Sequence, residues 1–321
     1  MIIISIIIPV YNVENFIEKC VRSLFEQVDI DQSTIELIFI NDCTPDSSMK
    51  VLQTYINEHN SKFKYLFLNN KINRGLAYAR NLGVENATGE YIMHLDSDDY
   101  LERDALSNLL HVCKQVPSVD IVVGNVYFDY GDRKEIAHLD SYQDKDEYLN
   151  HLLLRDSMVN IWGKLIKRQI YISHSIKAKE GINQGEDFSV YPILVYYARQ
   201  IEFVPKVVYN YLQTNDTSYC KAAASISAIN QIVGAQNIIS SFFENRLPPK
   251  IMEACILNTI LTLIIHAEYT NYAYIMDKFR KTSLLNSNIK FKQFVVLLLL
   301  KCKLYKLTSW GIKNFYRFKA K

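Results

Sequence analysis

The sequence predicts an α/β domain with a mainly parallel sheet and helices on both faces, followed by a helical C-terminal region. Short apolar runs alternate with helically spaced segments over the first 130 residues, and helical spacing alone continues beyond Ser225. Among the 321 residues, 49% are hydrophobic and 22% are charged, which excludes a disordered chain. Ten Gly and seven Pro are too few for a collagen-like or linker-rich architecture.

The predicted strands and helices alternate regularly. Ile2 to Val10 is a continuous apolar run, as expected of a central strand buried on both faces. Apolar residues at helical spacing between Phe16 and Val28 predict the first helix. The elements expected next are a strand at 35–40, a helix at 47–57, a strand at 63–68, a helix at 76–85, a strand at 91–95, a helix at 101–114 and a strand at 120–128.

We expect two domains with a boundary near residue 220. Residues 1–220 form the predicted α/β domain, in which 1–130 carry the regular alternation and 131–220 mix helices with short strands. Residues 221–321 form the predicted helical region. No run approaches the roughly 20 apolar residues of a spanning helix, and the six cysteines form no C-x-x-C pair. Since the N-terminus has no basic stretch typical of a secretory signal, the expected compartment is the cytoplasm.

The charge is distributed unevenly. The net charge is +2, but residues 278–321 hold 12 of the 36 Lys and Arg and none of the 34 Asp and Glu. This basic tail also contains apolar clusters such as 294–300, so we expect a helix at an anionic membrane surface, peripheral at the inner face of the cell membrane. A helix pair packed on the rest of the chain is the alternative. Nucleic acid is not expected as a partner, because the tail contains no recognisable binding module.

Polar side chains follow three of the predicted strands. Asn12 follows the first strand, Asp42 the second, and Asp96 and Asp98 the fourth. Ligands of parallel sheets bind beyond the carboxyl ends of the strands, so these residues mark a candidate site. Two carboxylates two residues apart can hold one divalent cation together with phosphate oxygens. The alternative for Asp96 to Asp99 is a turn that caps the next helix.

Five further residues could contribute to this site. Arg80 lies on a predicted helix near the same edge, where it could pair with an acidic side chain or a diphosphate, or remain solvated. Glu186 and Asp187 open another predicted helix, either as a general base with an acidic neighbour or as complements of the helix dipole. Trp162 and Lys164 could form the wall of an acceptor site, although a buried Trp is the default.

In this order, the motifs resemble the inverting glycosyltransferase family 2, whose members have the Rossmann-like GT-A fold. The resemblance is clear over about residues 3–130 and weaker to about 219. It implies that a sugar moves from a nucleotide-diphosphate donor, most often a UDP-sugar, to a hydroxyl of a glycan or lipid-linked saccharide. In that case 1–130 are the nucleotide-sugar-binding half and 131–220 the acceptor half. The matching segments are 5–12, 39–42, 73–75, 79–81, 95–99 and 185–187.

The resemblance also implies roles for the donor-binding residues. Pro9, Tyr11 and Asp42 would hold the nucleotide base and the ribose. Asn73 and Arg80 would support the nucleotide pocket.

The acidic motifs would carry the chemistry. Asp96 would contact the ribose or a metal ion, and Asp98 would bind Mn²⁺ or Mg²⁺ at the diphosphate. Asp187 would remove the proton of the acceptor hydroxyl, with Glu186 beside it.

Two departures from the family pattern affect this interpretation. The turn Asn41-Asp42-Cys43-Thr44 lacks the usual glycine, and the segment 212–218 has Gln213 where many relatives have Arg or His. A non-catalytic relative that binds sugar nucleotides or glycans is therefore the alternative. The presence of both Asp98 and Asp187 favours the enzyme.

Overall fold

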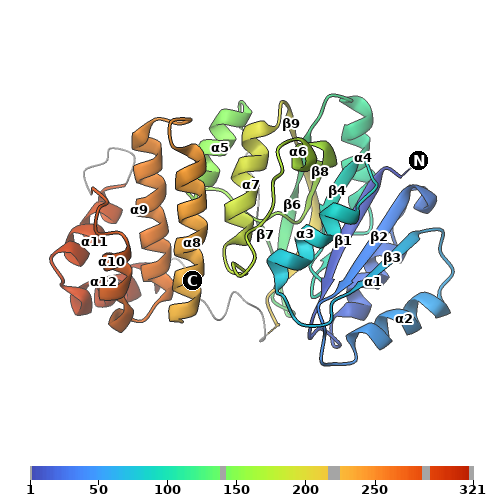
Figure 1. Cartoon of the computed structure of the whole chain (residues 1–321), viewed down its shortest axis with the longest axis horizontal. Coiled ribbons are helices and arrows are strands. Elements are labelled where there is room, and N and C mark those ends of the chain that lie inside the picture. Colours follow the sequence, from blue (N-terminus) through green and yellow to red (C-terminus); the bar gives the residue numbers. More distant parts are fainter. Residues whose placement is uncertain (1, 138–141, 216–224, 284–289, 318–321) are drawn as a thin grey trace. The chain divides into compact units, whose positions relative to one another are not determined.

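The computed structural model describes residues 2–137, 142–215, 225–283 and 290–317 (Figure 1). The chain divides into two compact units. The first contains residues 1–148 and 160–216, and the second contains 149–159 and 217–321. The segment 149–159 thus belongs to the second unit, although the sequence placed it within the first domain.

The first unit is built on one mixed sheet with the strand order β3-β2-β1-β4-β8-β6-β9-β5, and β7 pairs with β6. The four strands from β3 to β4 run parallel, as do β6 and β9, whereas β5, β7 and β8 are antiparallel to their neighbours. The predicted α/β class is confirmed. The strands are β1 (Ile4–Val10), β2 (Ile35–Asn41), β3 (Lys64–Asn69), β4 (Tyr91–His94), β5 (Tyr100–Leu101), β6 (Ile121–Asp129), β7 (Lys134–Ala137), β8 (Lys164–Lys167) and β9 (Ile201–Leu212).

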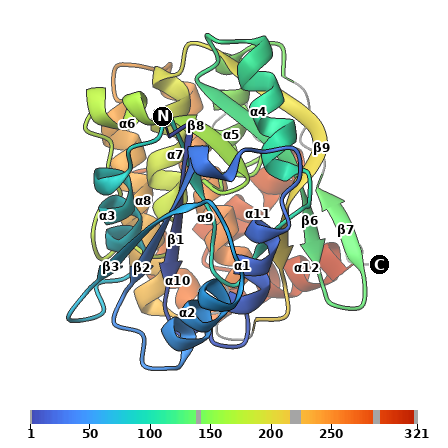
Figure 2. The ribbon, with the colours of Figure 1, turned by 90° about the vertical axis from the view of Figure 1, so that its right-hand side faces the viewer.

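Helices cover both faces of this sheet, with α1 and α2 on one face and α3 on the other (Figure 2). The topology explains this arrangement. The chain moves in one direction from β1 to β3 and then returns past β1 to β4, and right-handed crossovers place the returning helix on the opposite face. The helices that begin in this unit are α1 (Ile17–Phe25), α2 (Ser48–Glu58), α3 (Leu76–Asn86), α4 (Ala105–Gln115), α5 (Lys145–Leu153), α6 (Arg168–Ser173) and α7 (Glu186–Tyr197).

Burial along the strands follows their place in the sheet. All seven residues of β1 are buried, as expected from its unbroken apolar run between two parallel neighbours. No residue of β3, at the sheet edge, is fully buried. The carboxyl ends of β1 to β4 therefore lie along one edge, which is the edge where the sequence placed the candidate site.

The second unit is helical, as predicted. Its central helix α9 is long and apolar enough to cross a membrane by length and composition alone, and half of its apolar window is buried inside the structure. A buried contact fixes α8 against α9, because Thr259 donates a hydrogen bond to the side-chain oxygen of Gln236 at 2.5 Å. The helices are α8 (Ile226–Phe243), α9 (Pro249–His266), α10 (Tyr272–Lys278), α11 (Phe291–Lys301) and α12 (Tyr305–Arg317), with a 3-10 turn, η3 (Tyr269–Asn271).

Candidate active site

The loops that follow β1 and β2 are bonded to each other at the carboxyl edge. The backbone N–H groups of Asn12 and Glu14 donate to the side chains of Thr44 (2.8 Å) and Asp46 (2.9 Å). Burial opposes ionisation of Asp46, but hydrogen bonds from neighbouring hydroxyls hold its pKa below the usual value. The two loops therefore form one rigid rim, which leaves the ring of Tyr11 41% exposed above the end of β1. Asp46 was not predicted as a site residue.

Asp42 is only 3% exposed, and both of its carboxylate oxygens already accept hydrogen bonds. The donors are the Asn70 side chain (2.8 Å) and the backbone N–H groups of Arg74 (2.9 Å) and Gly75 (2.7 Å). Asp42 thus holds the loop between β3 and α3, which carries the exposed Asn73. Gly75 has φ +87°, and a Cβ there would lie 2.3 Å from the Asn183 amide, so only glycine fits. The predicted contact of Asp42 with a base or ribose stays a prediction.

Pro9 lies within a central strand, and Cys43 lies in the turn that lacks the expected glycine. Pro9 is buried within β1, opposite Ile40 of β2. Cys43 adopts φ +58° at the position where the sequence lacks the expected glycine. This left-handed conformation is unfavourable for a residue with a Cβ. The turn therefore keeps the backbone geometry that a glycine would give.

The acidic turn after β4 places its three carboxylates in different environments. Asp98 is partly exposed, and Asn215 donates a hydrogen bond to its Oδ2 at 2.8 Å. Asp99 is buried and accepts bonds from the Tyr209 hydroxyl and the Leu212 N–H, each at 2.8 Å. Burial raises the pKa of Asp98, and burial and its acidic neighbours raise the pKa of Asp99 further. Asp99 therefore fixes the turn against β9, and Asp98 is the available carboxylate.

Arg80, on α3, lies between the two acidic motifs and is only 4% exposed. Its Nη2 lies 3.0 Å from Asp96, and 3.7 Å from both Glu186 and Asp187. Burial raises the pKa of Asp96 to about 6, although Arg80 opposes the shift. The alternative of a solvated arginine was wrong. One buried cation instead joins carboxylates that lie far apart in sequence.

Glu186 and Asp187 form the first turn of α7, directly after Gly185, which has φ +84°. The backbone N–H of Ile161 donates to Oδ2 of Asp187 at 3.2 Å, whereas Oδ1 has no hydrogen-bond donor in the structure. Burial, and then the charge of Asp187, raise the pKa of Glu186 well above its usual value. Oδ1 of Asp187 is therefore buried, 3.7 Å from the Arg80 guanidinium, and lies beside a carboxyl group that favours its neutral form.

Trp162 and Lys164 do not form an exposed acceptor wall, because both are buried. The Trp162 ring stacks on Tyr209 with 4.4 Å between centroids, so the default reading of a buried Trp is confirmed. The ammonium of Lys164 donates to the backbone carbonyls of Asn160 (2.7 Å) and Trp162 (3.2 Å). Burial lowers the pKa of Lys164 to about 7, against the opposing charge of Asp187.

The donor set of the acidic turn fits a hard divalent cation that shares its shell with phosphate oxygens. Arg80 faces Asp96, Glu186 and Asp187, and Asp98 lies in the same turn as Asp96, so carboxylate oxygens are concentrated at this edge. No three His, Cys, Asp or Glu side chains within the described residues could hold a metal ion by themselves. A cation here would need ligands from the substrate, as Mg²⁺ usually does.

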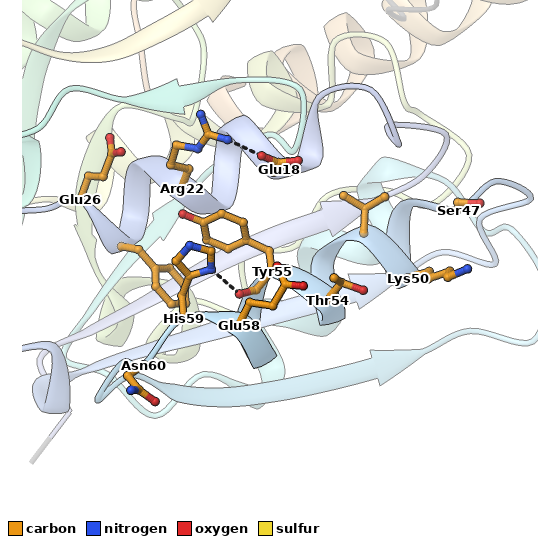
Figure 3. Close-up of a pocket in the computed structure, with 12 residues that line it drawn as sticks. Glu18, Arg22, Glu26, Ser47, Lys50, Thr54, Tyr55, Glu58, His59 and Asn60 are labelled. Atoms are coloured by element: carbon orange, nitrogen blue, oxygen red, sulfur yellow. Dashed lines mark hydrogen bonds and ion pairs between the residues drawn. The ribbon is translucent and has the colours of Figure 1, made fainter.

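A groove with a volume of about 1040 Å³ lies between α1 and α2 of the first unit (Figure 3). The stacked rings of Tyr55 and His59 and the ion pair of Arg22 with Glu18 line it. None of the predicted site residues lines this groove. The acidic cluster instead borders a cavity of about 10 Å³ beside Arg80 and His94, enough for one water molecule.

Sequence reasoning missed Tyr209, Asn215 and His94. Tyr209 and Asn215 lie more than 100 residues from the acidic turn they contact, and no local spacing indicates such pairing. His94 directly precedes the strand end that was predicted, and burial lowers its pKa, so it remains neutral. Its position two residues before Asp96 was the signal that could have identified it.

Comparison with known proteins identifies one family of enzymes and several similar relatives. The sequence model described as Glycosyl transferase family 2 matches residues 5–176, more than half of the chain. The glycosyltransferase GlyA of Streptococcus pneumoniae serotype 4 is 31% identical over 180 residues, which are 52% of this chain and 25% of GlyA. The chain spans between a quarter and three fifths of the length of this and two other similar relatives.

Solved structures share the fold over nearly the whole chain. S. aureus TarS 1-349 in complex with UDP-GlcNAc has a TM-score of 0.59 at 16% identity, and the match covers 99% of this chain and 92% of the TarS 1-349 chain. The mannosyltransferase PcManGT of Pyrobaculum calidifontis, in complex with GDP-Man and Mn²⁺, has a TM-score of 0.56 at 16% identity, covering 97% and 84%. With the family match over residues 5–176, these findings establish that the chain belongs to glycosyl transferase family 2.

Proposed function

We propose that this chain transfers a sugar from a UDP-sugar to a hydroxyl of a glycan or lipid-linked saccharide, with inversion at the anomeric carbon. One observation carries the proposal. Among the described residues Oδ1 of Asp187 accepts no hydrogen bond, and it lies 3.7 Å from Arg80, the cation that also pairs with Asp96 in the acidic turn after β4. A proton acceptor and a diphosphate-binding edge therefore lie within one cluster.

The reaction would be a single displacement. The acceptor oxygen attacks the anomeric carbon, the bond from that carbon to the diphosphate oxygen breaks, and UDP leaves with the bonding electron pair. Asp187 accepts the hydroxyl proton on Oδ1, a step that typically contributes about 10²–10⁴-fold to the rate. Because burial and the charge of Asp187 raise the pKa of Glu186, its carboxyl group favours the neutral form. Glu186 then places no second negative charge beside Oδ1 of Asp187.

Donor binding would use the rim at the carboxyl edge. The exposed Tyr11 ring suits a nucleobase, and the loop held by Asp42 carries Asn73 and would shape the pocket. Mn²⁺ or Mg²⁺, held by Asp98 with Asp96 as a second ligand, would supply charge neutralisation at the departing diphosphate. The buried side-chain amide nitrogen of Gln213 has no hydrogen-bond acceptor among the described residues, so Gln213 is the candidate donor from the segment where relatives have Arg or His.

The choice of donor and acceptor draws on the relatives. TarS was solved with UDP-GlcNAc, and TarS is named as a poly(ribitol-phosphate) beta-N-acetylglucosaminyltransferase. A UDP-linked hexose or N-acetylhexosamine and a polymeric or lipid-linked acceptor are therefore the first candidates. The non-catalytic alternative would bind the same donors without turnover.

A donor panel tests the proposal. The full-length protein is incubated with UDP-, GDP- and TDP-sugars and Mn²⁺, and release of the nucleoside diphosphate is measured beside calorimetric binding. We expect one UDP-sugar to be hydrolysed slowly without acceptor. The Asp187→Asn variant should bind the same donor but release UDP from it more slowly. Binding of a donor with no release, with or without acceptor glycans, would instead favour the non-catalytic relative. Absence of binding to every donor would contradict both.

A further inference from the structure

Half of the large exposed apolar side chains of the described residues belong to one short stretch of the chain. Among the described residues twelve large hydrophobic side chains are exposed, and six of them fall within residues 291–310. This stretch forms α11, α12 and the turn between them (Figure 1). Such a cluster on a folded unit usually marks an interaction surface. The six residues are Phe291, Val295, Leu298, Leu304, Leu307 and Trp310, and we call them the exposed tail face.

Helix α11 is amphipathic in an unusual way, because both of its faces are apolar. Leu297 and Leu300 point into the core of the second unit. On the opposite side, Phe291 (79% exposed), Val295 and Leu298 fall within about 60° of one another around the helix axis. The helix therefore has a second apolar stripe, which the described residues leave partly exposed, with Val295 at 38% and Leu298 at 46%.

Lysines border this stripe on both sides. At 100° per residue, Lys292 and Lys301 each lie about 60° beyond one edge of the stripe, and both are exposed. Lys303 and Lys306 are exposed beside Leu304 and Leu307. An apolar centre with a basic border is the pattern of a helix that lies in the interface of an anionic membrane.

The charge of the surface selects among possible occupants. No acidic residue follows Asp277, whereas residues 278–321 carry 12 Lys and Arg. A second copy of the chain placed face to face would bring these like charges together, which disfavours a two-fold dimer. An anionic lipid surface instead supplies the opposite charge and an apolar layer at the same time.

We propose that the exposed tail face docks on the surface of an anionic lipid bilayer. Helix α11 has 11 residues and is about 16 Å long, too short to span a bilayer, so it lies along the interface. Its buried face stays packed in the second unit while Phe291, Val295 and Leu298 enter the boundary between headgroups and acyl chains. The docking would hold the chain peripherally at the inner face of the cell membrane, near lipid-linked acceptors.

Vesicle co-sedimentation of the full-length protein tests this docking without any donor. We expect the protein to bind vesicles of phosphatidylcholine that contain about 30 mol% phosphatidylserine, and to be released from them by high salt. We expect it to bind neutral vesicles weakly. The combined variant Lys292→Gln, Lys301→Gln and Lys306→Gln should bind on the order of 100-fold more weakly, because each lysine contributes about five-fold. The variant Phe291→Ser, Val295→Ser and Leu298→Ser should lose binding by at least a similar factor.

Control variants remove lysine charges and apolar side chains from exposed positions of the first unit. Lys62→Gln, Lys64→Gln and Lys114→Gln remove equal charge, and Ile136→Ser with Ile172→Ser remove exposed apolar side chains. Circular dichroism checks that each variant is folded, which is expected since all of these side chains are exposed.

Three results would overturn the proposal. One is equal vesicle binding by the tail and control variants, and another is no binding of the parent protein to anionic vesicles. The last is a parent protein that does not bind vesicles but is dimeric in solution, together with a serine variant that is monomeric. That last result would assign the exposed tail face to a copy of the chain. None of the three depends on donor turnover, so a failure here is separate from a failure of the proposed transfer reaction.

Discussion

Replacing Arg80 by Gln should destabilise the first unit strongly. The guanidinium is buried, with Nη2 3.0 Å from Asp96 and 3.7 Å from both Glu186 and Asp187. Without it, these carboxylates keep their burial but lose their shared cation. Removing one partner of a buried ion pair typically lowers the free energy of unfolding by about 3–5 kcal/mol, and we expect a loss of that size at pH 8.

This loss should depend on pH. Burial already raises the pKa of Asp96 to about 6 and that of Glu186 well above its usual value, and Arg80 opposes both shifts. Its removal raises both pKa values further. A carboxyl group whose folded pKa exceeds its unfolded value lowers stability once the pH rises through the folded pKa, and has no such effect below the unfolded pKa. The destabilisation should therefore be largest at pH 8 and shrink as the pH falls towards about 4.

Urea unfolding followed by fluorescence measures this effect. A Trp310→Phe background leaves Trp162, which lies in the first unit and stacks on Tyr209, as the reporter. Arg22→Gln, which breaks an exposed pair with Glu18, is the control and should leave the unfolding midpoint unchanged. A loss below about 1 kcal/mol at pH 8, or an equal loss at pH 8 and pH 5, would refute the assignment of Arg80 as the shared cation of this cluster.

Three other substitutions test separate parts of the account. Cys43→Gly should raise the free energy of unfolding by about 0.5–1 kcal/mol, because glycine relieves the backbone strain at φ +58°. A lower free energy of unfolding in urea denaturation would contradict this. Lys164→Met removes a lysine whose folded pKa of about 7 lies below its unfolded value. The parent protein should gain about 2 kcal/mol over this variant between pH 7 and pH 9, because Lys164 is neutral when folded and charged when unfolded, and parallel pH profiles would argue against it. Asp98→Ala should abolish Mn²⁺-dependent donor binding in calorimetry, and unchanged metal-dependent affinity would exclude Asp98 as a ligand.

Much of the fold follows from local pattern. The unbroken apolar run of β1 predicted a central strand, and helical spacing predicted α1 to α4 within a few residues. The short strands β5, β7 and β8 were not predicted, because segments of two to four residues carry too little periodicity. Their pairing partners, rather than their own sequence, determine them. Strand β5, for example, exists through its pairing of Tyr100 and Leu101 with β9.

The candidate site was predictable where it depends on strand ends and less so where it depends on distant contacts. The rule that ligands bind at the carboxyl edge identified Asp42, Asp96 and Asp98 before the structure was known. The partners of Arg80 on α7 lie more than 100 residues away, so its role as a shared cation became visible only in three dimensions. Likewise, an acceptor wall at Lys164 was excluded by two backbone carbonyls that no sequence motif announces.

The rate of sugar transfer by Asp187→Asn tests the central claim most directly. Asparagine keeps the shape of the side chain and the hydrogen bond from Ile161, but it cannot accept the proton of the acceptor hydroxyl at neutral pH. With the donor identified by the panel and a glycan acceptor, we predict that donor affinity stays within a few-fold of the parent protein while transfer falls by roughly 10²-fold or more. Transfer at near the parental rate would contradict the account and would leave Asp187 as an acidic residue at the start of a helix.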